Sequence, residues 1–167
     1  AMAKNVWITL PTGRPIQQTD EIIVKDDGHG MSFEECNSHY LSVGRNRRSG
    51  ESEWTKAYNG LKPRKVQGRK GIGKLAGFGI AERIDIHTVK DKQIAHFALD
   101  FTALTKSPNF ADERGYVPET LSGDGTRTGG KPGTTVGLAQ LKISRAIDEE
   151  EFKRGLARRL LILDKNF

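Results

Sequence analysis

Two glycine-rich segments constrain the fold of this chain more than any other feature. The first, Val24–Met31, runs from a β-branched residue into two aspartates and two glycines, V-K-D-D-G-H-G-M. The second, Gly68–Lys74, is a glycine turn with cations, G-R-K-G-I-G-K, and it leads into an apolar stretch with helical spacing. Glycine turns at the start of a helix present backbone N–H groups to phosphates. The two segments, in this order, therefore predict a pocket in which a carboxylate recognises a base and backbone N–H groups bind phosphates.

The length of 167 residues fits one domain, and a hydrophobic content of 35% is enough for a modest core. The single cysteine, Cys36, excludes an internal disulfide and is typical of a reducing compartment, so we expect a cytoplasmic protein. No apolar run approaches the ~18 residues that a membrane span needs. We therefore expect no membrane partner.

Positive charge is concentrated in one part of the chain. Residues 45–74 contain ten cations and two acids, a local charge of +8, whereas the whole chain carries +6. The remaining residues therefore sum to −2. This cluster coincides with the second glycine motif and indicates a polyanionic partner, either a nucleotide or a nucleic acid.

Periodicity predicts the regular elements. Alternation and β-branched residues predict strands at 5–10, 20–25, 83–89, 93–101 and 134–143. Helical spacing predicts helices at 32–41, 72–82 and 148–164, and the first and third begin with capping-box patterns at Ser32 and Asp148. Two stretches lack periodicity, so we expect a mobile lid at 44–70 and an irregular loop at 105–132.

Two common phosphate-binding motifs fit the second segment incompletely. Gly68–Lys74 matches the start of a P-loop, but Leu75 stands where Ser or Thr would hold Mg²⁺. Gly71–Ala76 fits the loose dinucleotide pattern, but neither motif has the buried strand that should precede it. We reject both interpretations.

The motifs that fit form an ordered set. Asp26, Gly28 and Gly30 give D-x-G-x-G; Gly68, Gly71 and Gly73 give G-x-x-G-x-G; and Gly133-Thr134 opens a strand. This order resembles the Bergerat-fold ATPases, the superfamily of gyrase, the large heat-shock chaperone, histidine kinases and MutL. Leu41–Arg48 is similar to the motif that opens the lid in the chaperone-like and MORC-like branches, with Asn46 and Arg48 in place of Ser and Lys. The resemblance covers roughly residues 5–145.

The resemblance implies a fold and a ligand. The fold is α+β, a two-layer sandwich with a mixed, mostly antiparallel sheet of about five strands and helices on one face. The whole chain, residues 1–167, would be one ATP-binding domain that binds ATP or ADP with Mg²⁺. In a larger protein such a domain couples ATP binding to conformational change and can form an ATP-dependent homodimer.

The site residues follow from the same resemblance and from their chemistry. Asp26 accepts a hydrogen bond from the exocyclic amine of adenine, and Thr134 reaches Asp26 and adenine directly or through water. Gly28 and Gly30 let the backbone approach the base, and Met31 contacts the ring. Gly71 and Gly73 offer backbone N–H groups to the phosphates, and Lys70 or Lys74 adds charge. The remaining nucleotide-binding candidates are Gly44, in the motif that opens the lid, and Ile72.

The resemblance has one large departure. The family places a catalytic Glu and a Mg²⁺-binding Asn on a helix before the first strand, in the pattern E-x-x-x-N-x-x-D-A, and no segment of this sequence supplies it. We therefore predict no catalytic residue and no protein metal ligand in this chain, and no ATP hydrolysis by the chain as given.

Other interpretations are weaker or stay open. The main alternative is a basic nucleic-acid-binding module that uses residues 45–74, and a protein client is another possible partner. A histidine-kinase domain lacks the lid motif seen here. Cys36 and His39 have the spacing of metal ligands, but without two further ligands we expect a helix-surface pair. We expect His29 to face solvent; Trp54 could tether the lid or contact a partner.

Overall fold

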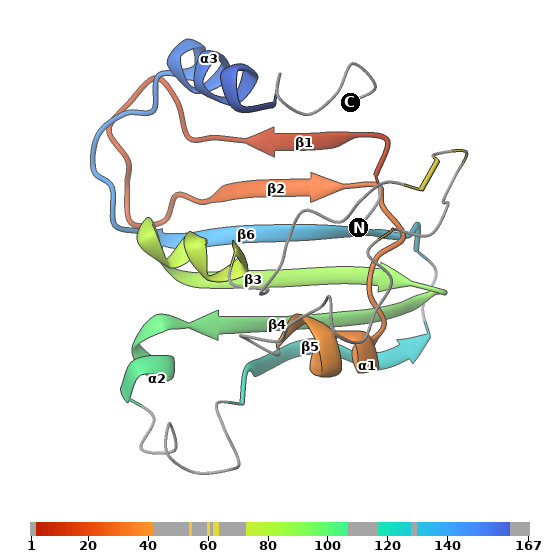
Figure 1. The fold of residues 1–167 in the computed structure, drawn as a ribbon. Coiled ribbons are helices and arrows are strands. Elements are labelled where there is room, and N and C mark those ends of the chain that lie inside the picture. The colour runs from red at the N-terminus through yellow and green to blue at the C-terminus, as the bar shows by residue number, and fades with distance from the viewer. Residues whose placement is uncertain are drawn as a thin grey trace.

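A six-stranded antiparallel sheet forms the centre of the computed structural model (Figure 1). The structure describes residues 3–41, 54, 60, 62–63, 73–106, 117–127 and 130–160. Every strand is antiparallel to its neighbours, in the order β1 (Val6–Thr9), β2 (Ile22–Asp26), β6 (Gly133–Leu141), β3 (Ala81–Lys90), β4 (Gln93–Asp100) and β5 (Glu119–Arg127). The predicted two-layer α+β fold is confirmed, with six strands in place of about five.

The helical elements are short, apart from the last one. In chain order they are α1 (Phe33–Glu35), the π-helical turn η1 (Cys36–Tyr40), the 3-10 helix η3 (Gly73–Gly79), α2 (Phe101–Lys106) and α3 (Glu149–Leu160). The capping box predicted at Ser32 is present, because the Glu35 N–H donates to the Ser32 hydroxyl and the Ser32 N–H donates to the Glu35 carboxylate. Among the described residues, no helix is long and apolar enough to cross a membrane.

The core lies between the sheet and the helical elements η1, η3 and α2. Alternation along β3 directs Ile84 and Ile86 to the helix-covered face, where they are 1% and 0% exposed. Cys36 from η1 and Phe78 from η3 complete the centre of this cluster from the other side. The helical turns η1 and η3 therefore cover β4 and β3, which lie at the centre of the core.

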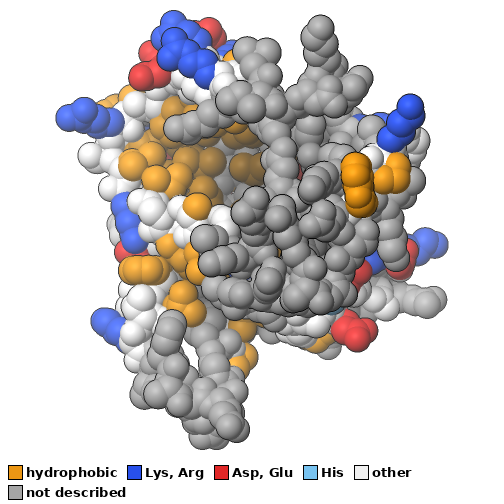
Figure 2. Space-filling view, viewed as in Figure 1, with side chains coloured by type: hydrophobic (Ala, Val, Ile, Leu, Met, Phe, Trp, Pro, Cys, Tyr) orange, Lys and Arg blue, Asp and Glu red, His pale blue; other side chains and the backbone are white. Residues whose placement is uncertain are grey.

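Apolar side chains also gather over β1, β2 and β6. The register places Ile8, Val24 and Val136 in one row across these three strands, on the face that carries the core. Figure 2 shows hydrophobic side chains on this face below the charged side chains of α3. This part of the sheet is therefore apolar beyond the helices that cover β3 and β4.

Two predicted segments differ from the structure. The stretch 105–132, predicted to be irregular, contains β5, and α2 was not predicted. The sequence of β5 has the polar composition of a loop, and the segment becomes a strand by pairing with β4. This pairing has register shifts between Gln93 and Phe97. The predicted helix at 72–82 is the shorter η3, and a Cβ on its Gly77 would lie 2.9 Å from both Ile84 and Leu138. This close approach of η3 to the sheet explains why position 77 is a glycine.

Candidate functional site

Three polar side chains from three neighbouring strands lie in one row. Asp26 on β2 is the register partner of Thr134 on β6, and Thr134 is the register partner of Thr88 on β3. Cross-strand partners point to the same face of a sheet. Because Thr88 alternates with Ile84 and Ile86, that face is the one that carries the core. The structure therefore places Asp26 next to Thr134, two residues separated by 108 positions in the sequence.

The Asp26 carboxylate is held by the turn that follows it. Its Oδ1 accepts a hydrogen bond of 2.8 Å from the N–H of Gly28, which leaves Oδ2 for another donor. Aspartate commonly closes a turn in this way, two residues ahead of itself in the chain. Gly28 is buried and Asp26 is half-buried. The carboxylate is therefore oriented by its own loop.

Two glycines allow the backbone segments around this row to touch. Gly30 has φ +67°, and a Cβ there would overlap the carbonyl oxygen of Val89 and lie 2.6 Å from its carbonyl carbon. At Gly133, a Cβ would overlap the carbonyl oxygen of Asp26. No other residue fits either place, so the loop after β2 and the start of β6 close tightly over the end of β3.

Thr88 joins these segments, although the motif analysis did not single it out. Its side chain is fully buried, and its hydroxyl accepts a hydrogen bond of 2.9 Å from the N–H of Met31. The same hydroxyl lies 3.2 Å from the carbonyl oxygen of Gly133 and 3.2 Å from the hydroxyl of Thr134. The signal in the sequence is a polar residue at an inward position of an alternating strand.

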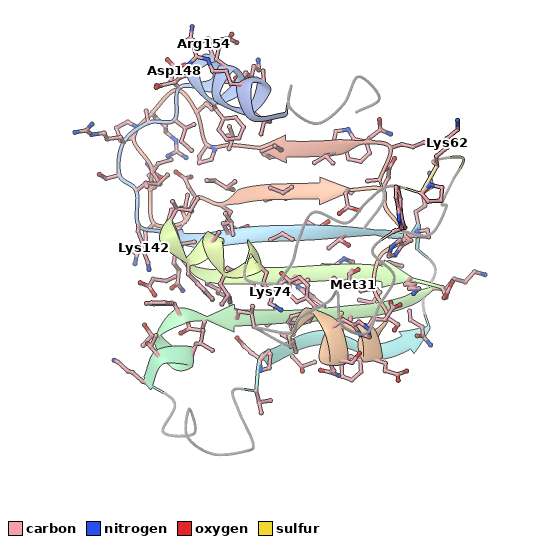
Figure 3. The ribbon with its side chains drawn as sticks, in the orientation of Figure 1. Met31, Lys62, Lys74, Lys142, Asp148 and Arg154 are labelled. Atoms are coloured by element: carbon pink, nitrogen blue, oxygen red, sulfur yellow. The ribbon has the colours of Figure 1, made fainter. Side chains whose placement is uncertain are left out.

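Met31, from the loop after β2, and Lys74, from η3, both lie over the sheet (Figure 3). Met31 packs against the core cluster and is half-buried. The Lys74 ammonium donates to the carbonyl oxygen of Tyr40 and lies 5.3 Å from the centre of the Tyr40 ring. Burial lowers the pKa of Lys74. In this arrangement Lys74 connects η3 to the end of η1.

Several predicted site residues fall outside the described residues. They are Gly44, Lys70, Gly71 and Ile72, together with most of the predicted lid at 44–70. Gly73 is described and exposed, and a Cβ there would meet no atom within 4 Å. The structure therefore brings together the adenine part of the predicted site: Asp26, Gly28, Gly30, Met31 and Thr134.

Cys36 and His39 do not form a ligand pair. Cys36 is 1% exposed, so the expected helix-surface pair is wrong for this residue. Burial, followed by the charge of Glu35, raises the pKa of the Cys36 thiol to about 11, whereas metal ligation and nucleophilic attack need a thiolate. Among the described residues, no group of three His, Cys, Asp or Glu side chains could hold a metal ion.

Two other residues singled out in the sequence are also described. Trp54 is 57% exposed. His29 is half-buried, and its Nδ1 lies 2.5 Å from the Gly30 carbonyl oxygen.

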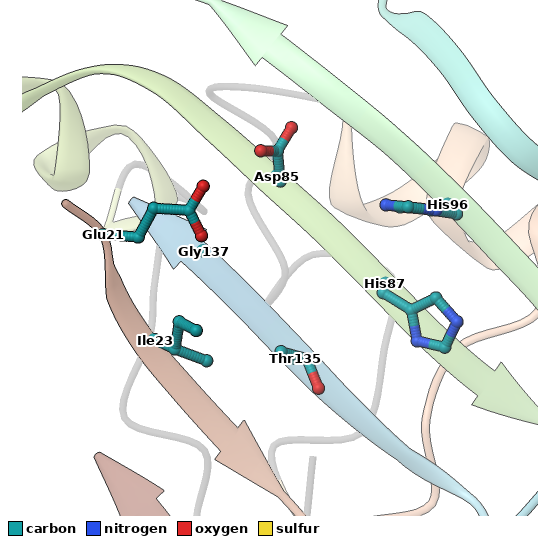
Figure 4. Close-up of a pocket in the computed structure, with 7 residues that line it drawn as sticks. All are labelled: Glu21, Ile23, Asp85, His87, His96, Thr135 and Gly137. Atoms are coloured by element: carbon teal, nitrogen blue, oxygen red, sulfur yellow. The ribbon is translucent and has the colours of Figure 1, made fainter. Parts of the chain in front are cut away.

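A hollow of about 220 Å³ lies on the face of the sheet opposite to the row that contains Asp26. Figure 4 shows the residues that line it: Glu21, Ile23, Asp85, His87, His96, Thr135 and Gly137. His87 and His96 are cross-strand partners whose ring centres lie 5.2 Å apart. This hollow shares no lining residue with the row of Asp26, Thr134 and Thr88.

The stability of the fold should decrease at acidic pH through His87. Burial first, and then the charges of His96 and Lys25, lower its pKa. The unfolded chain, with an ordinary histidine pKa of about 6.5, therefore binds more protons than the folded chain just below that pH. The contribution of His87 to the free energy of unfolding is fully present above about pH 6.5. It is lost as the pH falls below that value.

Urea unfolding near neutral and near pH 5 would test this expectation. We expect His87→Gln to lose less stability between the two pH values than the wild type. The exposed His39 provides the matched control, and His39→Gln should keep the acid sensitivity of the wild type. Equal pH dependence in the wild type and in His87→Gln would contradict the assignment.

Comparisons with known proteins match this chain to a family and to a curated relative. Residues 1–114 match the family described as histidine kinase-, DNA gyrase B-, and HSP90-like ATPase. The chain is also 30% identical, over 166 residues, to "Putative type II restriction enzyme HgiDII" of Herpetosiphon aurantiacus. That match covers 99% of this chain and 26% of the relative. The chain therefore spans about a quarter of the length of this curated relative.

Proposed function

This chain belongs to the family of histidine kinase-, DNA gyrase B- and HSP90-like ATPases, and we propose that its site binds adenine rather than guanine nucleotides. The observation that carries the proposal is the row of Asp26, Thr134 and Thr88 on three adjacent strands. A carboxylate accepts a hydrogen bond from the exocyclic amine of adenine, and guanine presents a carbonyl oxygen at that position. The selectivity therefore rests on Asp26.

The described residues fit the adenine end of a nucleotide. Gly28 and Gly30 are buried in the loop that follows Asp26, and a Cβ at Gly30 would overlap the carbonyl oxygen of Val89. Met31 continues this loop and carries a polarizable side chain suited to an aromatic ring. These features support a flat, aromatic ligand edge at this end of β2.

The phosphate end of the site remains a proposal from the sequence. Gly71 and Gly73 would present N–H groups to the phosphates, and Lys70 would add charge. Mg²⁺ would enter with the nucleotide, bound mainly by phosphate oxygens, as is usual for this ion. Lys74 becomes available to a phosphate only if it leaves the carbonyl oxygen of Tyr40.

The relative suggests the setting in which this domain works. Because the relative is named as a restriction enzyme, we propose that this chain is the nucleotide-binding part of a larger protein that acts on DNA. ATP binding would then control the conformation of that protein. We expect DNA cleavage by the complete protein to change with ATP and to lose this response in an Asp26→Asn variant.

Titration calorimetry with ATP, ADP and GTP in the presence of Mg²⁺ tests the central proposal. We expect ATP and ADP to bind and GTP to bind at least about tenfold more weakly, the effect of losing one hydrogen bond to a charged group. Equal affinity for GTP would contradict the proposed role of Asp26.

The same protein should be tested against the nucleic-acid alternative. A basic module that binds nucleic acid through residues 45–74 would show affinity that falls steeply with salt. ATP would not compete with that binding. Such a result, without measurable ATP binding, would favour the alternative over the nucleotide site.

A further inference from the structure

Thr88 holds together the two loops that form the proposed adenine site. It lies on β3, is 0% exposed, and has three hydrogen-bonding groups within 3.2 Å of its hydroxyl. These groups are the N–H of Met31, the carbonyl oxygen of Gly133 and the hydroxyl of Thr134. One hydroxyl therefore contacts both the loop that carries the aspartate–glycine motif and the turn that opens β6.

The hydrogen bonds around Thr88 allow two arrangements. A hydroxyl has one hydrogen to donate and two lone pairs to accept with, and the N–H of Met31 always occupies one lone pair. If Thr88 donates to Gly133, its contact with Thr134 is a hydrogen bond only when Thr134 donates its hydrogen to Thr88. If Thr88 donates to Thr134, the hydrogen of Thr134 is free to point toward Asp26 and its ligand. The state of Thr88 therefore decides whether Thr134 acts as an acceptor or a donor in the site.

We propose that Thr88 is a positioning residue of the nucleotide site, which fixes the Met31 loop and sets the hydroxyl direction of Thr134. This inference rests on the proposed binding of adenine nucleotide. Adenine presents a ring nitrogen, an acceptor, next to the amine that Asp26 would bind. Binding therefore selects the arrangement in which Thr88 donates to Thr134 and Thr134 donates into the site.

The loop geometry depends on the same hydroxyl. The N–H of Met31 follows Gly30, whose backbone presses against Val89 and Gly133. Without the Thr88 hydroxyl, this N–H would be left without its acceptor, which is unfavourable in a half-buried loop. Because Thr88 is fully buried and contacts these groups only from within the fold, its effect on the ligand passes through Met31 and Thr134.

The test compares Thr88→Val, which keeps the shape and removes the hydroxyl, with Thr88→Ser, which keeps the hydroxyl. We expect Thr88→Val to weaken ATP binding about tenfold and Thr88→Ser to bind within about threefold of the wild type. Thr135→Val is the matched control, because Thr135 follows Thr134 on β6 and its side chain points to the opposite face of the sheet. Circular dichroism confirms that each variant is folded at the temperature of the titration.

A double-mutant cycle with Thr134→Val separates positioning from general loss of stability. If Thr88 acts through Thr134, Thr88→Val should have much less effect on ATP affinity when Thr134 is already valine. Hydrogen exchange of the Met31 amide gives a readout without nucleotide, and it should speed up in Thr88→Val but not in Thr135→Val.

The outcomes distinguish this inference from the proposed function. If the wild type binds ATP and Thr88→Val binds it equally well, the inference is wrong and the proposed function stands. Fully additive effects in the cycle, or equal losses in Thr88→Val and Thr88→Ser, would also overturn it. If the wild type binds no adenine nucleotide under any condition tested, the proposed function and this inference both fail.

Discussion

Replacing Gly30 with alanine should abolish nucleotide binding and strongly destabilise the fold. An alanine at φ +67° costs about 1–2 kcal/mol, because its Cβ crowds the following carbonyl. The Cβ would also overlap the Val89 carbonyl group, and overpacking of this kind typically adds about 1–3 kcal/mol. We expect the free energy of unfolding, measured by urea titration, to fall by the sum of these two costs.

Gly13 provides a matched control for the Gly30 prediction. It has φ +77°, similar to that of Gly30, but a Cβ there would meet no atom within 4 Å. Gly13→Ala should therefore lose only the conformational part, about 1–2 kcal/mol, and should keep its affinity for ATP. Equal losses of stability in the two variants would mean that the contact of Gly30 with β3 does not matter.

The strands of the central sheet were predictable because their pattern is local. Ile84 and Ile86 alternate with Asp85 and His87, so one face is apolar whatever the partner strands are. β5 has no such alternation, and its pairing with β4 decides its structure. Local patterns therefore predicted five of the six strands, including the edge strand β1, and missed β5 at the other edge.

The candidate site was predictable only in part, for a related reason. The motifs identified Asp26 and Thr134, but their contact depends on β6 lying between β2 and β3. That strand order places residues distant in sequence side by side, and periodicity carries no information about it. Thr88 was missed because its importance appears only once the register of β3 with β6 is known.

Asp26→Asn should lower the affinity for ATP by about 1–3 kcal/mol, because a charged acceptor is replaced by an amide that both donates and accepts. The effect should be selective for the ligand. Asparagine keeps an oxygen that can accept from the N–H of Gly28, so the turn after β2 should persist. We expect calorimetry to show a clear loss of ATP affinity with little change in the unfolding transition.

Asp27→Asn is the matched control, since it makes the same chemical change one residue further along the chain. The Asp27 carboxylate accepts hydrogen bonds from the N–H groups of Lys4 and Asn5, at 2.7 and 2.9 Å, and from the Asn5 side chain. The bond from the Asn5 backbone N–H foremost, and then those from the Asn5 side chain and Lys4, lower the pKa of Asp27. Asp27→Asn should therefore weaken the attachment of the segment before β1 and leave the affinity for ATP unchanged. If the two variants lost ATP affinity equally, Asp26 would act through the local fold, and another group would have to recognise the base.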